Sequence, residues 1–412
     1  MNGDEMLTTE ATEMSVPLLD LKRYDEQLMD EFRHAFERVL LSGHYIMGPE
    51  VLAFEKECAE YIGAKHAIGV SSGTDALLLA LMTLGIGAGD EVICPTFTFF
   101  ATAGSIWRVG AKPVFVDSNP TCYNLDPSQI ARKITSKTKA IMPVHLYGQC
   151  AEMFEIMEIS RNYGIPVIED AAQAIGAEYK NLSAGTMGAF GCFSFFPSKN
   201  LGAFGDAGLL TTDDDELAHR ASLLRNHGAE PKYYHQHVGA NFRIDALQAA
   251  LLRVKLPHLD NYTAKRQSNA ALYTQLLMES GIAAPNTDAD VCAAHCATHQ
   301  TSTATNTDTP LLLPTACQSK HIYNQYVIRV RGAGGQRDEL RNFLNSKNIS
   351  TEIYYPVPLH LQECFVSLGH APGDFPLAEA AASETLALPI FPELTTGEIH
   401  YVVEQLSAFF QK

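Results

Sequence analysis

The sequence predicts an α/β fold, in which a mixed, mostly parallel sheet flanked by helices precedes a smaller α+β domain at the C-terminus. Short apolar runs typical of strands alternate with segments of helical periodicity over residues 16–260. The chain also has 412 residues, which is more than one small core accounts for. We expect a disordered start at 1–15, a large domain at 16–260 and a small domain at 261–412.

The elements of the large domain follow in chain order. Apolar residues at helical spacing predict helices at 18–41 and 49–61, and each pattern stops at a glycine. A strand at 66–70 leads through small polar residues into a helix at 75–84. Later patterns predict strands at 91–94, 113–116, 140–144, 166–168, 191–196 and 208–211, with helices at 127–134, 151–163, 216–224 and 245–256.

A long helix at 261–280 is expected to lead into the small domain. Its strands are predicted at 326–331 and 349–354, and its helices at 337–346, 379–385 and 396–410. Residues 284–320 are rich in Ala, Thr, Ser, Asn and Asp and predict a flexible insertion. This stretch contains Cys292, His295, Cys296 and His299, but their spacing matches no common zinc motif, so we expect a solvated loop without metal.

Charge and composition disfavour several classes of protein. The formal net charge is −17, which opposes binding to nucleic acid and to anionic membranes. No run approaches the roughly 18 apolar residues of a membrane helix. The first 15 residues carry four acids and lack the apolar core of a secretory signal. With nine irregularly spaced cysteines, we expect a cytoplasmic protein with free thiols.

Lys199 is placed as a reactive amine would be. It follows the aromatic run 193–196 and precedes a glycine-rich turn. A lysine held in such a turn can be desolvated, and a desolvated amine is a nucleophile near neutral pH. An arbitrary lysine is more often solvated in a surface loop. However, Asp170 ends an apolar run upstream, and this pair suits a cofactor that needs a pyridinium partner and a Schiff-base lysine.

The small polar segment 71–74 joins a predicted strand to a predicted helix. In this geometry the backbone N–H groups of a helix N-terminus can hold a phosphate. An ordinary N-cap is the alternative, since Ser, Thr and Asp favour these positions anyway. Phe99 lies in the next loop and could stack on a cofactor ring or pack in the core.

Eight segments occur in one order along the chain: GHYIMGPEV (43–51), SSGTDAL (71–77), GDEVICPTFTFFAT (89–102), PVHLYGQCAEM (143–153), IEDAAQAIGA (168–177), SFFPSKNLGAFGDAG (194–208), GANFRIDALQAA (239–250) and YYPVPLHLQ (354–362). With them the chain resembles the DegT/DnrJ/EryC1/StrS family of sugar aminotransferases, fold-type I enzymes that use pyridoxal 5'-phosphate (PLP). The resemblance covers about residues 16–283 and 320–412. One segment alone would be weak, whereas eight in order are specific.

The resemblance implies a role for each residue of the cofactor site. Lys199 would be the catalytic residue and carry the cofactor, and Asp170 would keep the pyridine nitrogen protonated. Gln173 would donate to the ring hydroxyl, and Phe99 would stack on the ring. The phosphate would be held by Gly73, Thr74 and Ser194, together with Asn241 from the neighbouring subunit.

The contribution of Asn241 implies a homodimer with shared active sites. Arg243 is the candidate for anionic groups of the substrate, because its planar guanidinium suits phosphate or carboxylate; a surface ion pair is the alternative. Tyr354, Tyr355 and His360 would line the sugar side, unless they only satisfy a loop between prolines.

We therefore expect an aminotransferase that moves an amino group from an amino acid, with L-glutamate as the expected donor, to a keto-sugar nucleotide. The segments 43–51 and 354–362 favour a 3-keto sugar, made into an amino sugar for a surface polysaccharide or a glycosylated metabolite. One alternative is a PLP-dependent dehydratase on the same fold, but these relatives carry His in place of the lysine. A non-catalytic regulatory protein and an amino-acid aminotransferase are further alternatives.

Overall fold

The computed structural model describes residues 14–286, 309–332 and 335–411. In its larger part, strands form two hydrogen-bonded groups in the orders β3-β2-β4 and β1-β9-β8-β5. Parallel bridges from Ile141 to Val167 and from Val144 to Asp170 join the groups into one sheet. In this sheet β9 pairs antiparallel with β1 and β8, and the other described strand pairs are parallel, so the predicted mixed, mostly parallel sheet is confirmed. The strands are β1 His66–Val70, β2 Glu91–Pro95, β3 Lys112–Val116, β4 Thr138–Ile141, β5 Ile168–Asp170, β8 Phe190–Ser194 and β9 Gly208–Thr212, with a separate hairpin of β6 Glu178–Tyr179 and β7 Leu182–Ser183.

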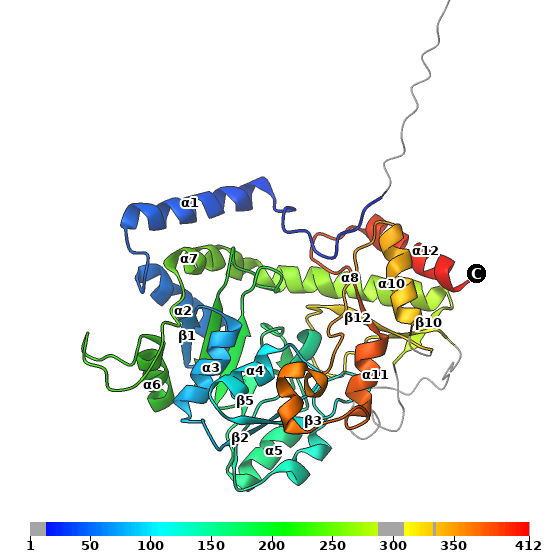
Figure 1. The fold of residues 1–412 in the computed structure, drawn as a ribbon. Coiled ribbons are helices and arrows are strands. Elements are labelled where there is room, and N and C mark those ends of the chain that lie inside the picture. The colour runs from blue at the N-terminus through cyan, green and yellow to red at the C-terminus, as the bar shows by residue number, and fades with distance from the viewer. Residues whose placement is uncertain (1–13, 287–308, 333–334, 412) are drawn as a thin grey trace, which may run out of the picture.

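Helices cover both faces of this sheet (Figure 1). Because side chains alternate along a strand, Ile93 faces one core cluster while its neighbours Val92 and Cys94 face the other. The first cluster contains residues of α1 Glu26–Ser42, α2 Pro49–Ile62, α5 Met153–Tyr163 and α7 Ala246–Lys255. The second contains residues of α3 Gly73–Thr83, α4 Ala101–Arg108 and α6 Asp215–Arg225.

The long helix α8 Leu259–Glu279 links the large sheet to a smaller one (Figure 1). The small sheet has the strand order β10-β11-β12-β13 and its own apolar core. Val16 belongs to this small core and bridges to Ile349, so the first described residues pack on the small core before the chain enters the large sheet. The elements are β10 Ala283–Pro285, β11 Leu311–Leu313, β12 Tyr326–Val330, β13 Thr385–Leu388, α10 Gln336–Ser346, α11 Pro376–Glu384 and α12 Thr396–Phe410.

Several predicted elements differ in the structure. The first helix begins at Glu26, because Asp25 caps it by accepting a hydrogen bond from the Leu28 amide. Residues 127–134 form two short 3-10 turns instead of one helix. Residues 349–354 form only isolated bridges, so the strand predicted there is wrong.

The predicted insertion at 284–320 is narrower in the structure. The apolar triplet Leu311–Leu313 is fully buried as β11, between β10 and β12, so this part of the segment is a strand. The low overall apolar content of 284–320 concealed these three residues. Cys292, His295, Cys296 and His299 lie outside the described residues, as do residues 1–13 of the predicted N-terminal disorder. Among the described helices, none combines the length and the apolar character that crossing a membrane requires.

Candidate active site

A cavity of about 480 Å³ opens where the carboxyl ends of β1, β5 and β8 meet. Ligand sites in α/β sheets form at this edge, because the loops that leave neighbouring strands converge there. The cavity is lined by the predicted residues Gly73, Thr74, Phe99, Asp170, Gln173, Ser194, Lys199, Tyr354 and Tyr355. Segments that lie far apart in the sequence are therefore brought together as expected.

Lys199 lies in a turn that is closed by two backbone hydrogen bonds. Its amide donates to the Phe196 carbonyl at 2.8 Å, and the Ala203 amide returns to the Phe195 carbonyl at 2.7 Å. The Lys199 side chain is partly exposed and lines the cavity. Burial lowers the pKa of its amine to about 8, and the nearby charge of Asp170 opposes part of that shift. The amine therefore loses its proton far more readily than an ordinary lysine does.

This pKa predicts how coupling of the amine to an aldehyde depends on pH. Only the neutral amine is a nucleophile, so the rate at which apoenzyme couples to added PLP is expected to rise with pH and level off above about 8. The rate is read from the visible absorbance band of the coupled cofactor, with Lys199→Ala as the blank. A plateau reached only near pH 10 would show that Lys199 titrates like an exposed lysine.

Asp170 is the last residue of β5, and its carboxylate accepts hydrogen bonds from neutral groups. It is 4% exposed. The Thr102 hydroxyl donates to Oδ2 at 2.8 Å and the Ala172 amide donates to Oδ1 at 3.2 Å. Burial raises the pKa of Asp170, and these two hydrogen bonds and the charge of Lys199 oppose the shift. A negative charge so placed fits a cationic ring nitrogen in the cavity.

The N-terminus of α3 provides a site for an anion in the same cavity. Ser72 caps the helix by accepting from the Asp75 amide at 3.1 Å, and the first helical residues are Gly73 and Thr74. A Cβ atom on Gly73 would lie 2.7 Å from the Cβ atom of Ser194, so only glycine permits this approach. The hydroxyl of Ser194 thus lies beside the positive end of a helix, which suits a phosphate.

The side-chain amide of Gln173 has a fixed orientation. Its Oε1 accepts from the Tyr147 backbone amide at 2.7 Å, and its Nε2 donates to the Tyr355 hydroxyl at 2.9 Å. Because a backbone amide can only donate, Oε1 must face Tyr147, and Gln173 offers only N–H groups to the cavity. This fits donation to an oxygen on a cofactor ring.

Phe99 has the exposure that a stacking ring requires. Its side chain is 55% exposed and borders the cavity, 6.0 Å from the Tyr355 ring between centroids. Two residues earlier, Phe97 is 1% exposed and packs in the core. Core packing therefore explains Phe97 and does not explain Phe99.

Three predicted residues do not line this chain's cavity. Asn241 is exposed on the segment between α6 and α7, and Arg243 donates to Asn226 Oδ1 at 2.7 Å. His360 is buried, with Nδ1 2.8 Å from the Thr96 hydroxyl and Nε2 3.1 Å from Glu379 Oε1. Both ring nitrogens of His360 are thus occupied by protein groups, so the structure corrects its predicted place on the sugar side to a buried position that ties its loop to Thr96.

The cavity also contains residues that the sequence did not single out. Thr102 supports Asp170 from the first turn of α4, and Asp206 and Gln325 add polar groups to the wall. Asp206 lies within a segment that the sequence had marked for Lys199. Gln325 lies directly before β12 of the small sheet, and no local sequence pattern connects that segment to the loops of the large sheet.

The model of the DegT/DnrJ/EryC1/StrS aminotransferase family matches residues 26–313 and 295–407. The chain belongs to this family. The family predicted from the eight ordered segments is thus confirmed, and the cofactor of this family member is PLP. The cavity fits PLP, because an amine, a carboxylate and an anion site converge in it.

Relatives in this family share nearly the whole chain. A protein from Geobacillus stearothermophilus named pleiotropic regulatory protein is 47% identical over 97% of this chain and 99% of its own. A UDP-2-acetamido-2-deoxy-3-oxo-D-glucuronate aminotransferase from Pseudomonas aeruginosa is 38% identical over 95% of this chain and 99% of its own. The crystal structure of S. venezuelae DesV in complex with a ketimine intermediate is similar with a TM-score of 0.86 and 39% identity, over 97% of this chain and 99% of that one.

Proposed function

We propose that this family member transfers an amino group from an amino acid, with L-glutamate as the donor, to a keto-sugar nucleotide. One observation carries the proposal: the amine of Lys199 and the carboxylate of Asp170 line the same cavity as an anion-binding helix N-terminus. Lys199 argues against the dehydratase alternative, whose members have His at this position. The relatives named as transaminases of nucleotide sugars support the substrate class.

When bound, PLP supplies an aldehyde that accepts the amino group and a ring that withdraws electrons from the reacting carbon. Asp170 would keep a proton on the ring nitrogen, because its carboxylate is buried and accepts hydrogen bonds from the neutral donors Thr102 and Ala172. The amides of Gly73 and Thr74 would hold the phosphate, and the N–H groups of Gln173 would orient the ring through its hydroxyl. Lys199 would hold the cofactor between turnovers, and its amine, with a pKa of about 8 when free, would then be the base that moves the proton.

The proposed acceptor is a 3-keto sugar. Four relatives at 38–40% identity have names that place the oxo or amino group at C3, and their nucleotides are either dTDP or UDP. The test is to incubate holoenzyme with glutamate and a panel of 3-keto and 4-keto sugars linked to dTDP, UDP or GDP. Production of 2-oxoglutarate only with 3-keto sugars is expected. Transfer to 4-keto sugars alone would contradict the regiochemistry, and no transfer to any would contradict the function.

A regulatory role without catalysis is the second candidate. The names of two relatives, at 47% and 41% identity, refer to regulation or sensory transduction. The intact pair of Lys199 and Asp170 favours catalysis, since a purely regulatory protein has no use for a desolvated amine beside a buried acid. Five buried cysteines are free thiols, which agrees with the cytoplasmic location that we propose: Cys58, Cys94, Cys122, Cys150 and Cys192.

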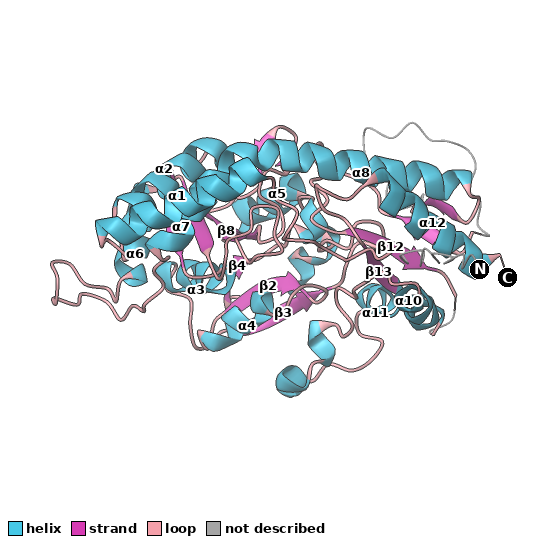
Figure 2. Cartoon of the chain, turned by 90° about the horizontal axis from the view of Figure 1, so that it is seen from above, coloured by secondary structure: helices cyan, strands magenta, loops and turns pink. Residues whose placement is uncertain are grey.

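We further propose a homodimer with shared active sites. Among the residues that line the cavity of one chain, Lys199 alone carries a cationic side chain, and a nucleotide diphosphate needs more positive charge. Arg243 and Asn241 lie outside that cavity, on the segment between α6 and α7, part of which projects from the body (Figure 2). Tyr233, Tyr234 and Val238 on this projection are exposed, as expected of groups that a second copy would cover.

Mixed dimers test the shared site. Lys199→Ala and Asn241→Ala homodimers are each expected to be weak or inactive, because every site lacks one group. After dissociation and reassociation together, about half of the dimers are mixed, and one of the two sites in each is intact. Recovered activity is therefore expected to approach about a quarter of wild type. No recovery despite proven exchange, or a fully active Asn241→Ala homodimer, would contradict the contribution of Asn241 across subunits.

A further inference from the structure

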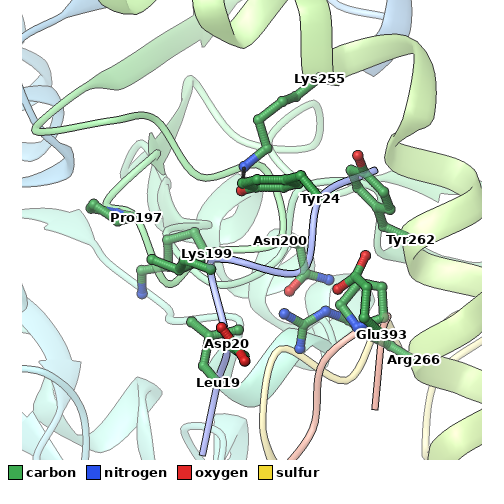
Figure 3. A pocket seen from close by; sticks show the side chains of 12 residues that line it. Leu19, Asp20, Tyr24, Pro197, Lys199, Asn200, Lys255, Tyr262, Arg266 and Glu393 are labelled. Atoms are coloured by element: carbon green, nitrogen blue, oxygen red, sulfur yellow. Dashed lines mark hydrogen bonds between the residues drawn. The ribbon is translucent and has the colours of Figure 1, made fainter. Parts of the chain in front are cut away.

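The turn that carries Lys199 borders a second cavity, much smaller than the first (Figure 3). Its volume of about 30 Å³ is enough for one water molecule. Its wall is formed by the segment before α1, the C-terminal end of α7, the first half of α8 and the loop at Pro392 and Glu393. In Figure 3 the amine of Lys199 points away from that of Lys255, so the two lysines lie on different sides of one turn.

Lys255 is the last residue of α7 and is 4% exposed. Its Nζ donates to the Gly202 carbonyl at 2.6 Å and to the Tyr24 hydroxyl at 3.1 Å. The amine also lies over the Tyr24 ring, 5.4 Å from its centroid. Both hydrogen-bond acceptors are neutral, and one of them belongs to the turn that holds Lys199.

The Gly202 carbonyl is a point where this turn can be held. A Cβ atom on Gly202 would lie 2.2 Å from the Pro197 carbonyl oxygen, so the chain crosses itself closely there. Lys199 lies in the short loop that this approach of Gly202 to Pro197 closes. The side-chain amide of Asn200 also ties the turn outward, to the Ile322 carbonyl at 3.2 Å. A shift of Gly202 would therefore be transmitted directly to Lys199.

A buried ammonium with neutral partners is a poor way to stabilise a protein. Desolvating a charge costs free energy that hydrogen bonds recover only in part, and an apolar side chain of the same length often serves a buried site as well. Burial accordingly lowers the pKa of Lys255 to about 8, although the charge of Glu393 favours its proton. The ammonium of Lys255 is therefore better explained by the position it gives to the Gly202 carbonyl than by a contribution to stability.

We propose that Lys255 is a positioning residue for Lys199, whose ammonium holds the Gly202 carbonyl and thereby fixes the turn that presents the Lys199 amine to the cofactor cavity. The inference rests on the proposed role of Lys199 as the lysine that couples to PLP. It concerns a residue that lines only the small cavity and does not touch the cofactor site.

The test compares Lys255→Met, which keeps the length and removes the charge and the donor, with Lys265→Met on the exposed side of α8. Three quantities are measured: the melting temperature of apoenzyme, the rate at which added PLP gives its visible band, and kcat. In Lys255→Met the melting temperature is expected to stay at or above that of wild type. The coupling rate and kcat are expected to fall about tenfold or more, because a displaced reacting group loses rate steeply. Lys265→Met is expected to match wild type in all three.

The outcomes separate a positioning role from a structural one. Wild-type coupling and kcat in Lys255→Met would overturn the proposal, because the turn would then hold without the ammonium. A variant that fails to fold, or whose losses merely follow a lowered melting temperature, would also overturn it by making Lys255 a stabilising group. Lys255→Arg, which restores charge and donors, is expected to recover part of the coupling rate. If wild-type apoenzyme gave no band with PLP, the proposed function would fail first.

Discussion

Lys199→Ala is expected to abolish amino transfer, with kcat lowered at least about 10³-fold. The amine is the only cationic side chain among the lining residues of the cavity, and burial brings its pKa to about 8. No other lining side chain offers both a nucleophile and a base of that strength. Transfer from glutamate is followed through 2-oxoglutarate, and borohydride reduction followed by mass spectrometry checks whether PLP is attached.

The same variant is expected to keep its fold. The turn around Lys199 is closed by backbone hydrogen bonds from Lys199 and Ala203, which alanine at position 199 retains. Removing an amine that burial disfavours in its charged form does not cost packing in the core. The melting temperature should stay near that of wild type, and Lys139→Ala at an exposed position is the matched control. A Lys199→Ala enzyme that turns over normally would move the catalytic role to another residue.

The parts of the site that the sequence predicted are those with a strong local pattern. Lys199 lies between an aromatic strand and a glycine turn, and Asp170 ends a short apolar run, so strand, turn and charge could be recognised within about ten residues. Gly73 was predicted from the transition of strand into helix, and the 2.7 Å approach of its would-be Cβ to Ser194 explains the glycine. Strands and helices also alternate along the chain as expected of an α/β fold.

What the sequence could not predict depends on contacts between distant segments. His360 follows two tyrosines that do line the cavity, but its ring turns inward because Thr96 and Glu379 bond both nitrogens. The sequence around Thr102 is that of an ordinary helix, and its hydrogen bond to Asp170 arises only because the fold places α4 beside the end of β5. Lys255 has the pattern of a lysine at a helix end, and only the return of the chain at Gly202 buries it.

Asp170→Asn is expected to lower kcat about as severely as the loss of Lys199, while PLP still binds. The amide is nearly the same size as the carboxylate, so Thr102 and Ala172 can still surround it. However, a neutral amide gives a protonated ring nitrogen no counter-charge, and the ring then accepts electrons poorly. The change is measured as kcat with glutamate and a keto-sugar nucleotide. Retained PLP is measured from its absorbance after gel filtration.

Stability distinguishes this loss from damage to the fold. The pKa of Asp170 is raised in the folded apoenzyme, so the folded chain holds this proton more tightly than the unfolded chain does. Ionisation of Asp170 therefore lowers the free energy of unfolding as pH rises through the folded pKa, and asparagine removes that penalty. Asp170→Asn apoenzyme is expected to melt at or above the wild-type temperature at neutral pH.

Thr102→Val, which keeps the carboxylate but removes a donor, should retain more activity than Asp170→Asn. If Asp170→Asn kept wild-type kcat, another group would have to protonate the ring, and the cavity offers only Asp206 as a second acid.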